Sequence, residues 1–161
     1  MTEDLAEVMG QITHGVYVIG VCDGEQQNAF TASWVMQVSF KPLLIAFSIN
    51  PEHYSYKLLQ KGGVCSINVL GKEQMEIAAH FGLPYNKSKM EGYEWLQNRD
   101  VPVLATAAAY FDCKVSHYTE AGDHKIVVCE VLNAEILKKY ELLLYADTAA
   151  MDGGSENYKQ P

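Results

Sequence analysis

The sequence of 161 residues has little of what would direct it to nucleic acids or membranes. Lysine and arginine number 12 against 20 aspartates and glutamates, so the formal net charge is −8. This balance argues against nucleic acid or an anionic membrane surface as the main partner, because both favour basic patches. No stretch approaches the roughly 18 consecutive apolar residues of a membrane span. The first ten residues are acidic, where a secretory signal would be basic, so a cytoplasmic location is expected.

Cysteine and histidine are present, but they lack the spacings that bind metals. The four cysteines lie far apart without a Cys-x-x-Cys pair, and the five histidines show no i, i+4 pair. We therefore expect no metal site, and we expect the cysteines to be buried, reduced thiols on strands. The first expected strand is also not followed by Gly-x-Gly-x-x-Gly, so nothing supports a Rossmann dinucleotide site.

The composition and patterning instead indicate one globular domain over residues 1–161. Hydrophobic residues make up 48% of the chain and charged residues 20%, and the chain has no repeat or linker. Alternation predicts strands over residues 15–21, 28–40, 43–49, 64–70, 107–118 and 124–137. Helical spacing predicts short helices over 3–9, 55–63 and 72–82, the second capped by Ser55. Because the strands mostly follow one another directly, a small antiparallel barrel with helices outside is the economical arrangement.

The expected strand at residues 28–40 has an unusual polar side. One row of alternate residues is apolar and should be buried: Phe30, Ala32, Trp34, Met36, Val38 and Phe40. The other row is mostly polar: Thr31, Ser33, Val35, Gln37 and Ser39. These polar side chains either face water or hold a polar ligand. A buried hydroxyl left unpaired would cost about 1–3 kcal/mol.

Several short motifs stand in a characteristic order along the chain. They are GVYVIGV, NAFTASWVMQVSFKPLLIAFSIN, YSYKLLQKGGVCSINVL, AAHFG and AGDHKIVVCEV. Together they resemble the flavin reductase-like, FMN-binding split-barrel family, and within it most nearly the flavoredoxin branch. The resemblance spans about residues 15 to 137. It implies a mainly β (α+β) fold: a six- to seven-stranded antiparallel split β-barrel of Greek-key type with two or three short flanking helices. It also implies a homodimer that binds FMN near the subunit contact.

The resemblance carries over a set of flavin-contacting positions. The ring and ribityl chain would be lined by Asn28, Thr31, Ala32, Ser33 and Trp34, and the isoalloxazine bordered by the backbone of Ser48, Ile49 and Asn50. Ser55 and a lysine after HFG would face the phosphate. Lys89 matches the family's lysine best, although Met90 replaces the usual aromatic residue, and Lys87 is the alternative. Without the resemblance, Trp34 would be expected to pack in the core, and either lysine would be expected to be a solvated charge in a loop.

His124, in the AGDH motif, would lie beside the ring and is the only candidate for a catalytic role, with Asp123 placed to orient it. Family members often end with a segment that closes over the site. Here Leu143, Leu144 and Tyr145 are followed by acidic, Gly-rich residues, so we expect residues 146–161 to form a flexible or lid-forming tail.

The function implied is that of an FMN-binding oxidoreductase, which passes electrons from NADH or NADPH through FMN to free flavin or a redox partner protein. The cofactor carries this chemistry, while the protein supplies position and hydrogen bonds. The alternative is a flavoredoxin-type electron carrier without direct NAD(P)H activity. A third option is a related barrel that binds haem, with His14 or His124 as the axial ligand.

Overall fold

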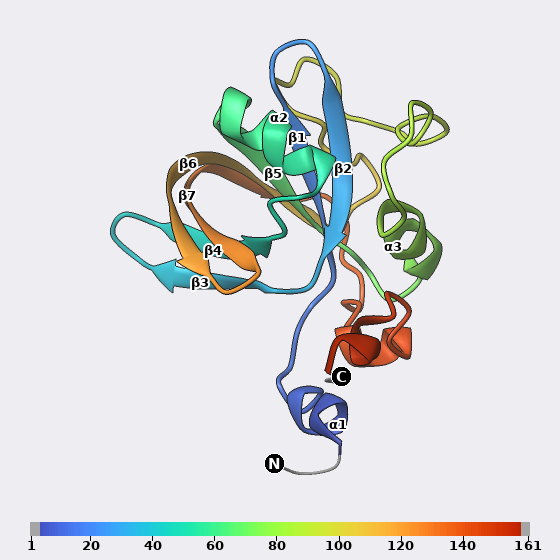
Figure 1. The fold of residues 1–161 in the computed structure, drawn as a ribbon. Coiled ribbons are helices and arrows are strands. Elements are labelled where there is room, and N and C mark those ends of the chain that lie inside the picture. The colour runs from blue at the N-terminus through green and yellow to red at the C-terminus, as the bar shows by residue number, and fades with distance from the viewer. Residues whose placement is uncertain (1–3, 159–161) are drawn as a thin grey trace.

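The computed structural model describes residues 4–158 and gives them a mainly β fold (Figure 1). The strands are β1 (Tyr17–Cys22), β2 (Gln27–Ala32), β3 (Val35–Ser39), β4 (Leu44–Ile49), β5 (Val64–Val69), β6 (Ala109–Ala121) and β7 (His124–Ile136). The α-helices are α1 (Leu5–Met9), α2 (Tyr54–Gly62) and α3 (Met75–Phe81). Two 3-10 helices follow, η1 (Tyr145–Thr148) and η2 (Gly154–Tyr158). The predicted fold class, antiparallel with two or three short helices, is confirmed.

The seven strands form one antiparallel sheet in the order β2-β1-β5-β6-β7-β4-β3. β2 and β3 are consecutive in the chain, yet they lie at opposite ends of this order. Only Ser33 and Trp34 connect them, so the sheet must curl until its two edges meet at this point. The two edges do not pair with each other, and the result is a split barrel.

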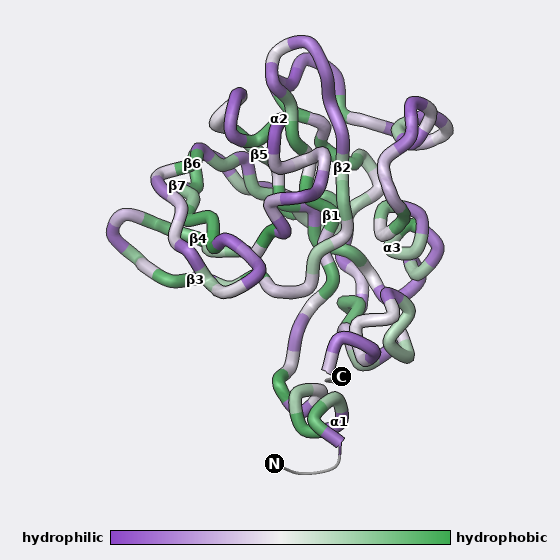
Figure 2. Tube along the Cα trace, in the orientation of Figure 1, coloured by the Kyte–Doolittle hydropathy of each residue, from purple (hydrophilic) through white to green (hydrophobic). Residues whose placement is uncertain are grey.

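Apolar side chains fill both faces of the central strands. Ile19 and Ile67 lie in the barrel interior with Phe47 and Leu59, whereas Val18 faces a second cluster beneath α3. Figure 2 shows that the apolar stretches follow the strands, while the β1–β2 turn and the loop after α3 are hydrophilic. Both faces of β1 are therefore occupied, one by the barrel interior and one by α3.

All four cysteines are free and lie on strands. Cys22 is half-buried, and the other three are buried.

The prediction of one strand over residues 28–40 with a buried apolar row is wrong beyond Ala32. The chain turns at Ser33 and Trp34, and the apolar row continues on the outward face of the edge strand β3. Trp34 is 49% exposed and Phe40 is 84% exposed, and Met36 and Val38 are also exposed. Alternation shows which residues share a face, but it does not show whether another element covers that face.

The start of α2 also differs from the expectation. His53 occupies the N-cap position, not Ser55, which lies inside the first turn and is buried. The end of the helix is as expected, because Gly63 adopts the left-handed conformation (φ 70°) that favours glycine after a helix. The first helix was expected over residues 3–9; its residue 3 lies outside the described residues.

Residues after β7 form the two 3-10 helices beside α1 (Figure 1). The Tyr145 ring meets the His14 ring edge-on at 6.5 Å, and its hydroxyl donates to Asp152 Oδ1 at 2.9 Å. A lid role for residues 146–161 stays a prediction, and residues 159–161 lie outside the described part.

The helices of residues 4–158 are all too short or too polar to cross a membrane.

The assignment of faces predicts a large difference between two leucines. Leu59 is fully buried, so Leu59→Ala should lower the free energy of unfolding by about 2–5 kcal/mol. Leu83 is exposed, so Leu83→Ala should change the free energy of unfolding by less than about 0.5 kcal/mol. Urea unfolding of both variants measures the difference, and equal losses would contradict the burial of Leu59 in the barrel interior.

Candidate functional site

The candidate site lies along the outer edge of β2, between α2 and α3 (Figure 1). Alternate residues of a strand point to opposite faces, so Asn28 points toward α2 and Thr31 toward α3. The contacts agree: Asn28 Nδ2 donates to Ser55 Oγ in α2 at 2.9 Å, and Thr31 Oγ1 donates to the Ala78 carbonyl in α3 at 2.7 Å. Asn28 and Thr31, two of the expected flavin contacts, therefore point to opposite faces of this edge strand.

Asn28 contains a buried acceptor with no protein partner. Asn28 and Ser55 are each 2% exposed, and their hydrogen bond uses the amide nitrogen of Asn28. The Asn28 Oδ1 atom is buried and accepts no hydrogen bond from residues 4–158. An unpaired buried acceptor costs about 1–3 kcal/mol, and a ligand hydroxyl would remove this cost. This atom fits the polyhydroxyl chain of a flavin.

The polar residues that follow Asn28 have fewer hydrogen-bonding groups available to a ligand than the sequence suggested. The Thr31 hydroxyl already donates its proton to Ala78, so only its lone pairs can meet a ligand. Ala32 and Ser33 are half-buried where the chain leaves β2. Thr31 therefore joins β2 to α3 whether or not a ligand is present.

The N-terminus of α2 is the first of several positive features near Asn28. α2 has nine residues, and the His53 side chain makes no capping hydrogen bond to any of them. The amide groups of a first helical turn point outward along the helix axis and attract anions. Ser55 belongs to this turn, so its hydroxyl lies among these amides.

Lys89 adds a buried positive charge. Its side chain is 3% exposed, its Nζ donates to the Leu83 carbonyl at 2.7 Å, and burial lowers the pKa of Lys89 to about 8. Lys87, the alternative from the sequence, is exposed in the turn before it. The structure thus places Lys89, rather than Lys87, against the body of the protein.

His53 was missed by the sequence reasoning. Burial lowers the pKa of His53, the charges of His124 and Lys89 lower it further, and the charge of Glu52 offsets part of this effect. These three side chains come from the α2 N-terminus, the start of β7 and the loop after α3, so three segments bring basic groups together. The only available signal was the position of His53 directly before the YSYKLL motif, which is also a common place for a histidine without function.

His124 and Trp34, which the resemblance placed beside the flavin ring, contact each other. Their ring centroids are 5.1 Å apart, and His124 Nδ1 donates to Asp123 Oδ1 at 2.7 Å. This hydrogen bond lowers the pKa of Asp123 and fixes the imidazole, as the sequence interpretation suggested. The Trp34 carbonyl accepts from the Ser48 amide at 3.1 Å, which ties the connection between β2 and β3 to β4.

The two positions after Ser48 have their side chains already engaged. The Ile49 side chain is buried in the core, and Asn50 Oδ1 accepts from the Glu52 amide at 2.9 Å. Ile49 can therefore offer a ligand only its backbone, and one lone pair of Asn50 Oδ1 is already used. The predicted contacts of both residues with the flavin stay predictions.

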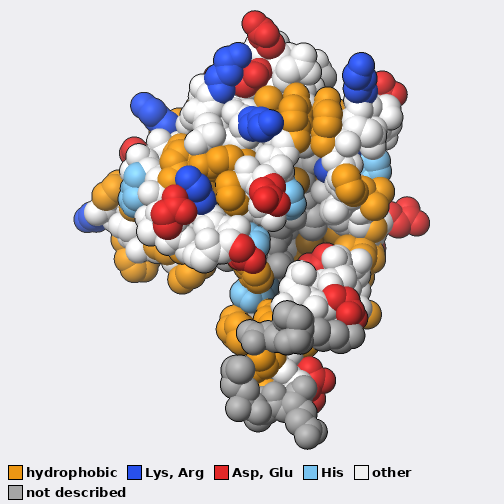
Figure 3. All heavy atoms as spheres, viewed as in Figure 1, with side chains coloured by type: hydrophobic (Ala, Val, Ile, Leu, Met, Phe, Trp, Pro, Cys, Tyr) orange, Lys and Arg blue, Asp and Glu red, His pale blue; other side chains and the backbone are white. Residues whose placement is uncertain are grey.

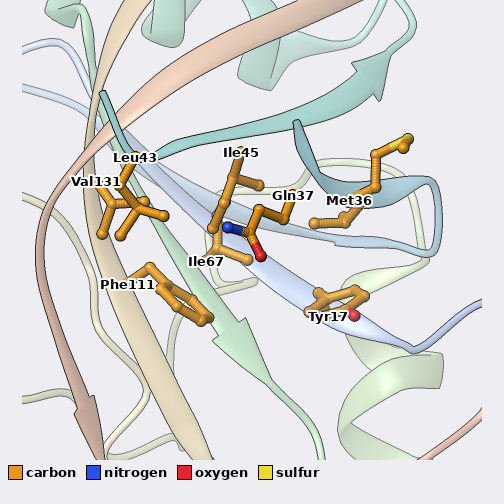
Figure 4. A pocket seen from close by; sticks show the side chains of 9 residues that line it. Tyr17, Met36, Gln37, Leu43, Ile45, Ile67, Phe111 and Val131 are labelled. Carbon is orange, nitrogen blue, oxygen red and sulfur yellow. The ribbon is translucent and has the colours of Figure 1, made fainter. Parts of the chain in front are cut away.

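A separate cavity is lined by side chains that come from every strand except β2 and from the turn before β4 (Figure 4). Its lining is mostly apolar: Tyr17, Val35, Met36, Gln37, Leu43, Ile45, Ile67, Phe111 and Val131. None of the expected flavin contacts lines this cavity. Its walls offer no cationic side chain for a phosphate, so we place the candidate site at β2, where polar and basic groups converge. Residues 4–158 also hold no group of three or more His, Cys, Asp or Glu side chains arranged for a metal ion.

The likeness to known proteins agrees with this geometry. The family described as "Flavin reductase like domain" matches residues 9–154. The Ferric-chelate reductase (NAD(P)H) of Archaeoglobus fulgidus is 29% identical over 153 residues, which cover 92% of this chain and 90% of that protein. Diflavin flavoprotein A 1 of Synechocystis is 30% identical over 142 residues, 86% of this chain, but the chain spans only 25% of its length.

Solved structures show the same fold. The Streptomyces globisporus NADH:FAD oxidoreductase SgcE6, in complex with NAD and FAD fragments, has a TM-score of 0.81 at 25% identity and covers 89% of this chain and 87% of its own. BorF, the flavin reductase component of a bacterial two-component tryptophan halogenase, has a TM-score of 0.79 at 26% identity, with coverages of 89% and 92%. The chain therefore belongs to the family of flavin reductase-like domains.

Proposed function

We propose that this protein is an FMN-binding oxidoreductase that passes electrons from NAD(P)H through the flavin to free flavin or a protein acceptor. Two features support this most strongly in a flavin reductase-like fold: Asn28 donates to Ser55 in the first turn of α2, and the charge of buried Lys89 acts on His53 at the same helix end. This combination offers a hydroxyl acceptor next to a site for an anion, which matches a ribityl chain that ends in a phosphate.

The residues of the chain have separate tasks in this proposal. Lys89 and the first turn of α2 bind the phosphate, and Asn28 Oδ1 accepts from a ribityl hydroxyl. Trp34 and His124 border the ring, and Asp123 holds the imidazole through Nδ1. When bound, the flavin supplies the redox chemistry by taking electrons from a reduced nicotinamide and passing them on.

A homodimer is part of the same proposal. Met36 and Val38 on β3 are exposed, and so are Phe40 and Leu43 in the turn that follows. Leu43 also lines the apolar cavity. Figure 3 shows hydrophobic side chains gathered over the β3 side of the molecule. Contiguous apolar surface of this kind marks interaction sites. We propose that a second copy of this chain covers the exposed apolar surface at β3.

The cytoplasmic location expected from the sequence stays a prediction.

The role of Lys89 predicts a selective loss of affinity. Lys89→Met removes the charge while keeping much of the side chain's bulk, so FMN binding should weaken about 10- to 100-fold, as expected for a hydrogen bond to a charged group. Riboflavin lacks the phosphate, so its affinity should not change. Titration calorimetry measures both, and Lys87→Met is the matched control that should bind FMN normally. Equal effects at the two lysines would contradict the assignment.

The lowered pKa of Lys89 also predicts a pH dependence. The ammonium of the ligand-free protein loses its proton near pH 8, and a bound phosphate would raise this pKa. FMN affinity should therefore be highest below pH 8 and fall by up to about tenfold for each pH unit above it. Riboflavin binding to the same protein should stay flat, and so should FMN binding to Lys89→Met. A pH-independent FMN affinity in the unmodified protein would exclude Lys89 as the phosphate partner.

A flavoredoxin-type carrier is the second candidate. The chain spans only a quarter of the diflavin flavoprotein it resembles, so domains of this kind also occur as parts of longer proteins.

Rapid mixing with a reductant separates the two functions. The protein loaded with FMN should lose its absorbance near 450 nm, where oxidised flavin absorbs, when mixed with NADH or NADPH. Loss within seconds supports the reductase. No loss with either nucleotide, together with reduction by dithionite, supports the carrier, and a protein that takes up no FMN contradicts both.

A further inference from the structure

Two tyrosines join α2 to the loop that follows α3. Tyr54 is the first residue of α2, and Tyr85 lies in the loop of residues 83–90. Their ring centroids are 4.0 Å apart and their planes differ by 26°, so the rings are stacked. Tyr54 also packs against the barrel core, while Tyr85 is 39% exposed. The stack therefore fastens an exposed loop to a fixed helix.

The loop that carries Tyr85 is itself held in place. Lys89 Nζ donates to the Leu83 carbonyl at 2.7 Å, which closes the loop across its base. His80 Nε2 in α3 donates to the Lys89 carbonyl at 2.7 Å, and Asn86 Oδ1 accepts from both the amide and the hydroxyl of Ser88. These bonds fix the backbone on both sides of Tyr85, so its ring has a defined position.

The stacked pair lies at the end of the candidate site where the phosphate would bind. Tyr54 stands between His53 and Ser55 in the chain, and Tyr85 shares its short loop with Lys89. Lys89 is close enough to His53 for its charge to act on the imidazole. The two rings thus bridge the same two segments, the α2 N-terminus and the loop, that supply the anion-binding groups.

We propose that the Tyr54–Tyr85 stack closes the phosphate end of the site and makes the protein select FMN over FAD. The inference rests on the proposed function, because it assumes that a flavin binds along β2. FMN ends at its single phosphate, whereas FAD continues through a second phosphate to adenosine.

The spacing of the rings explains the selection. Aromatic layers pack at the optimal carbon–carbon separation of about 3.5–4.0 Å, so two rings 4.0 Å apart leave no space for a third group between them. The adenosine half of FAD must therefore separate the two rings or extend away from the stack in another direction. FMN needs neither change, so its binding does not disturb the stack.

The test removes the exposed ring. Tyr85→Ala should raise FAD affinity about 3- to 10-fold, which corresponds to the loss of one aromatic pair, and should leave FMN affinity within about threefold. Titration calorimetry of the full chain with each flavin measures the ratio of the two dissociation constants. Tyr85→Phe keeps the ring and should keep the ratio of the unmodified protein. Leu83→Ala alters an exposed side chain in the same loop and should also keep it.

Two results would overturn the inference while leaving the proposed function intact. One is an unchanged ratio in Tyr85→Ala, and the other is weaker FAD binding, which would mean that the rings hold the adenine instead of excluding it. A protein that binds neither flavin, although circular dichroism shows it folded, would refute the proposed function and the inference with it. Circular dichroism of Tyr85→Ala confirms that this variant is folded before its ratio is compared.

Discussion

The free edge of β2 is the constraint on which the site depends. β2 and β3 are joined by only two residues but lie at opposite ends of one sheet, so the sheet curls and leaves both edges without a strand partner. At β2 this edge is flanked by α2 and α3, which approach it from the two faces. A closed barrel would pair this edge with another strand and leave no room for a ligand. The split is therefore what leaves this edge available to a ligand.

The basic groups near the N-terminus of α2 decide whether an anion can bind there more than the negative net charge of the protein does. The chain carries a formal net charge of −8, yet the charges of both His124 and Lys89 act on His53, the residue before α2, and Glu52 offsets only part of their effect on its pKa. Burial strengthens the interaction of Lys89 with an anion, because little water remains to screen it. An acidic protein can in this way hold a phosphate through one buried lysine and a turn of backbone amides, without the extended basic surface that nucleic acids require.

The sequence predicted the kind of fold but not how some faces are covered. The hydrophobic alternation located the strands, and the order of motifs indicated the family. The alternation could not show that the side chains of Trp34 and Phe40 are exposed to solvent, because a row of apolar residues has the same pattern whether another element packs on it or not. The motif favours Lys89 over Lys87 without excluding either, and only the folded loop shows that Lys89 is buried and Lys87 exposed. The contact of Tyr54 with Tyr85 joins two distant segments, which no local pattern reports.

A crystal structure of the complex with FMN shows whether the edge of β2 binds the phosphate arm of the flavin. The phosphate should lie against the first turn of α2, within hydrogen-bond distance of Ser55 Oγ and Lys89 Nζ, and a ribityl hydroxyl should donate to Asn28 Oδ1. Flavin bound instead in the apolar cavity beside Tyr17 and Phe111, with the edge of β2 empty, would contradict this prediction.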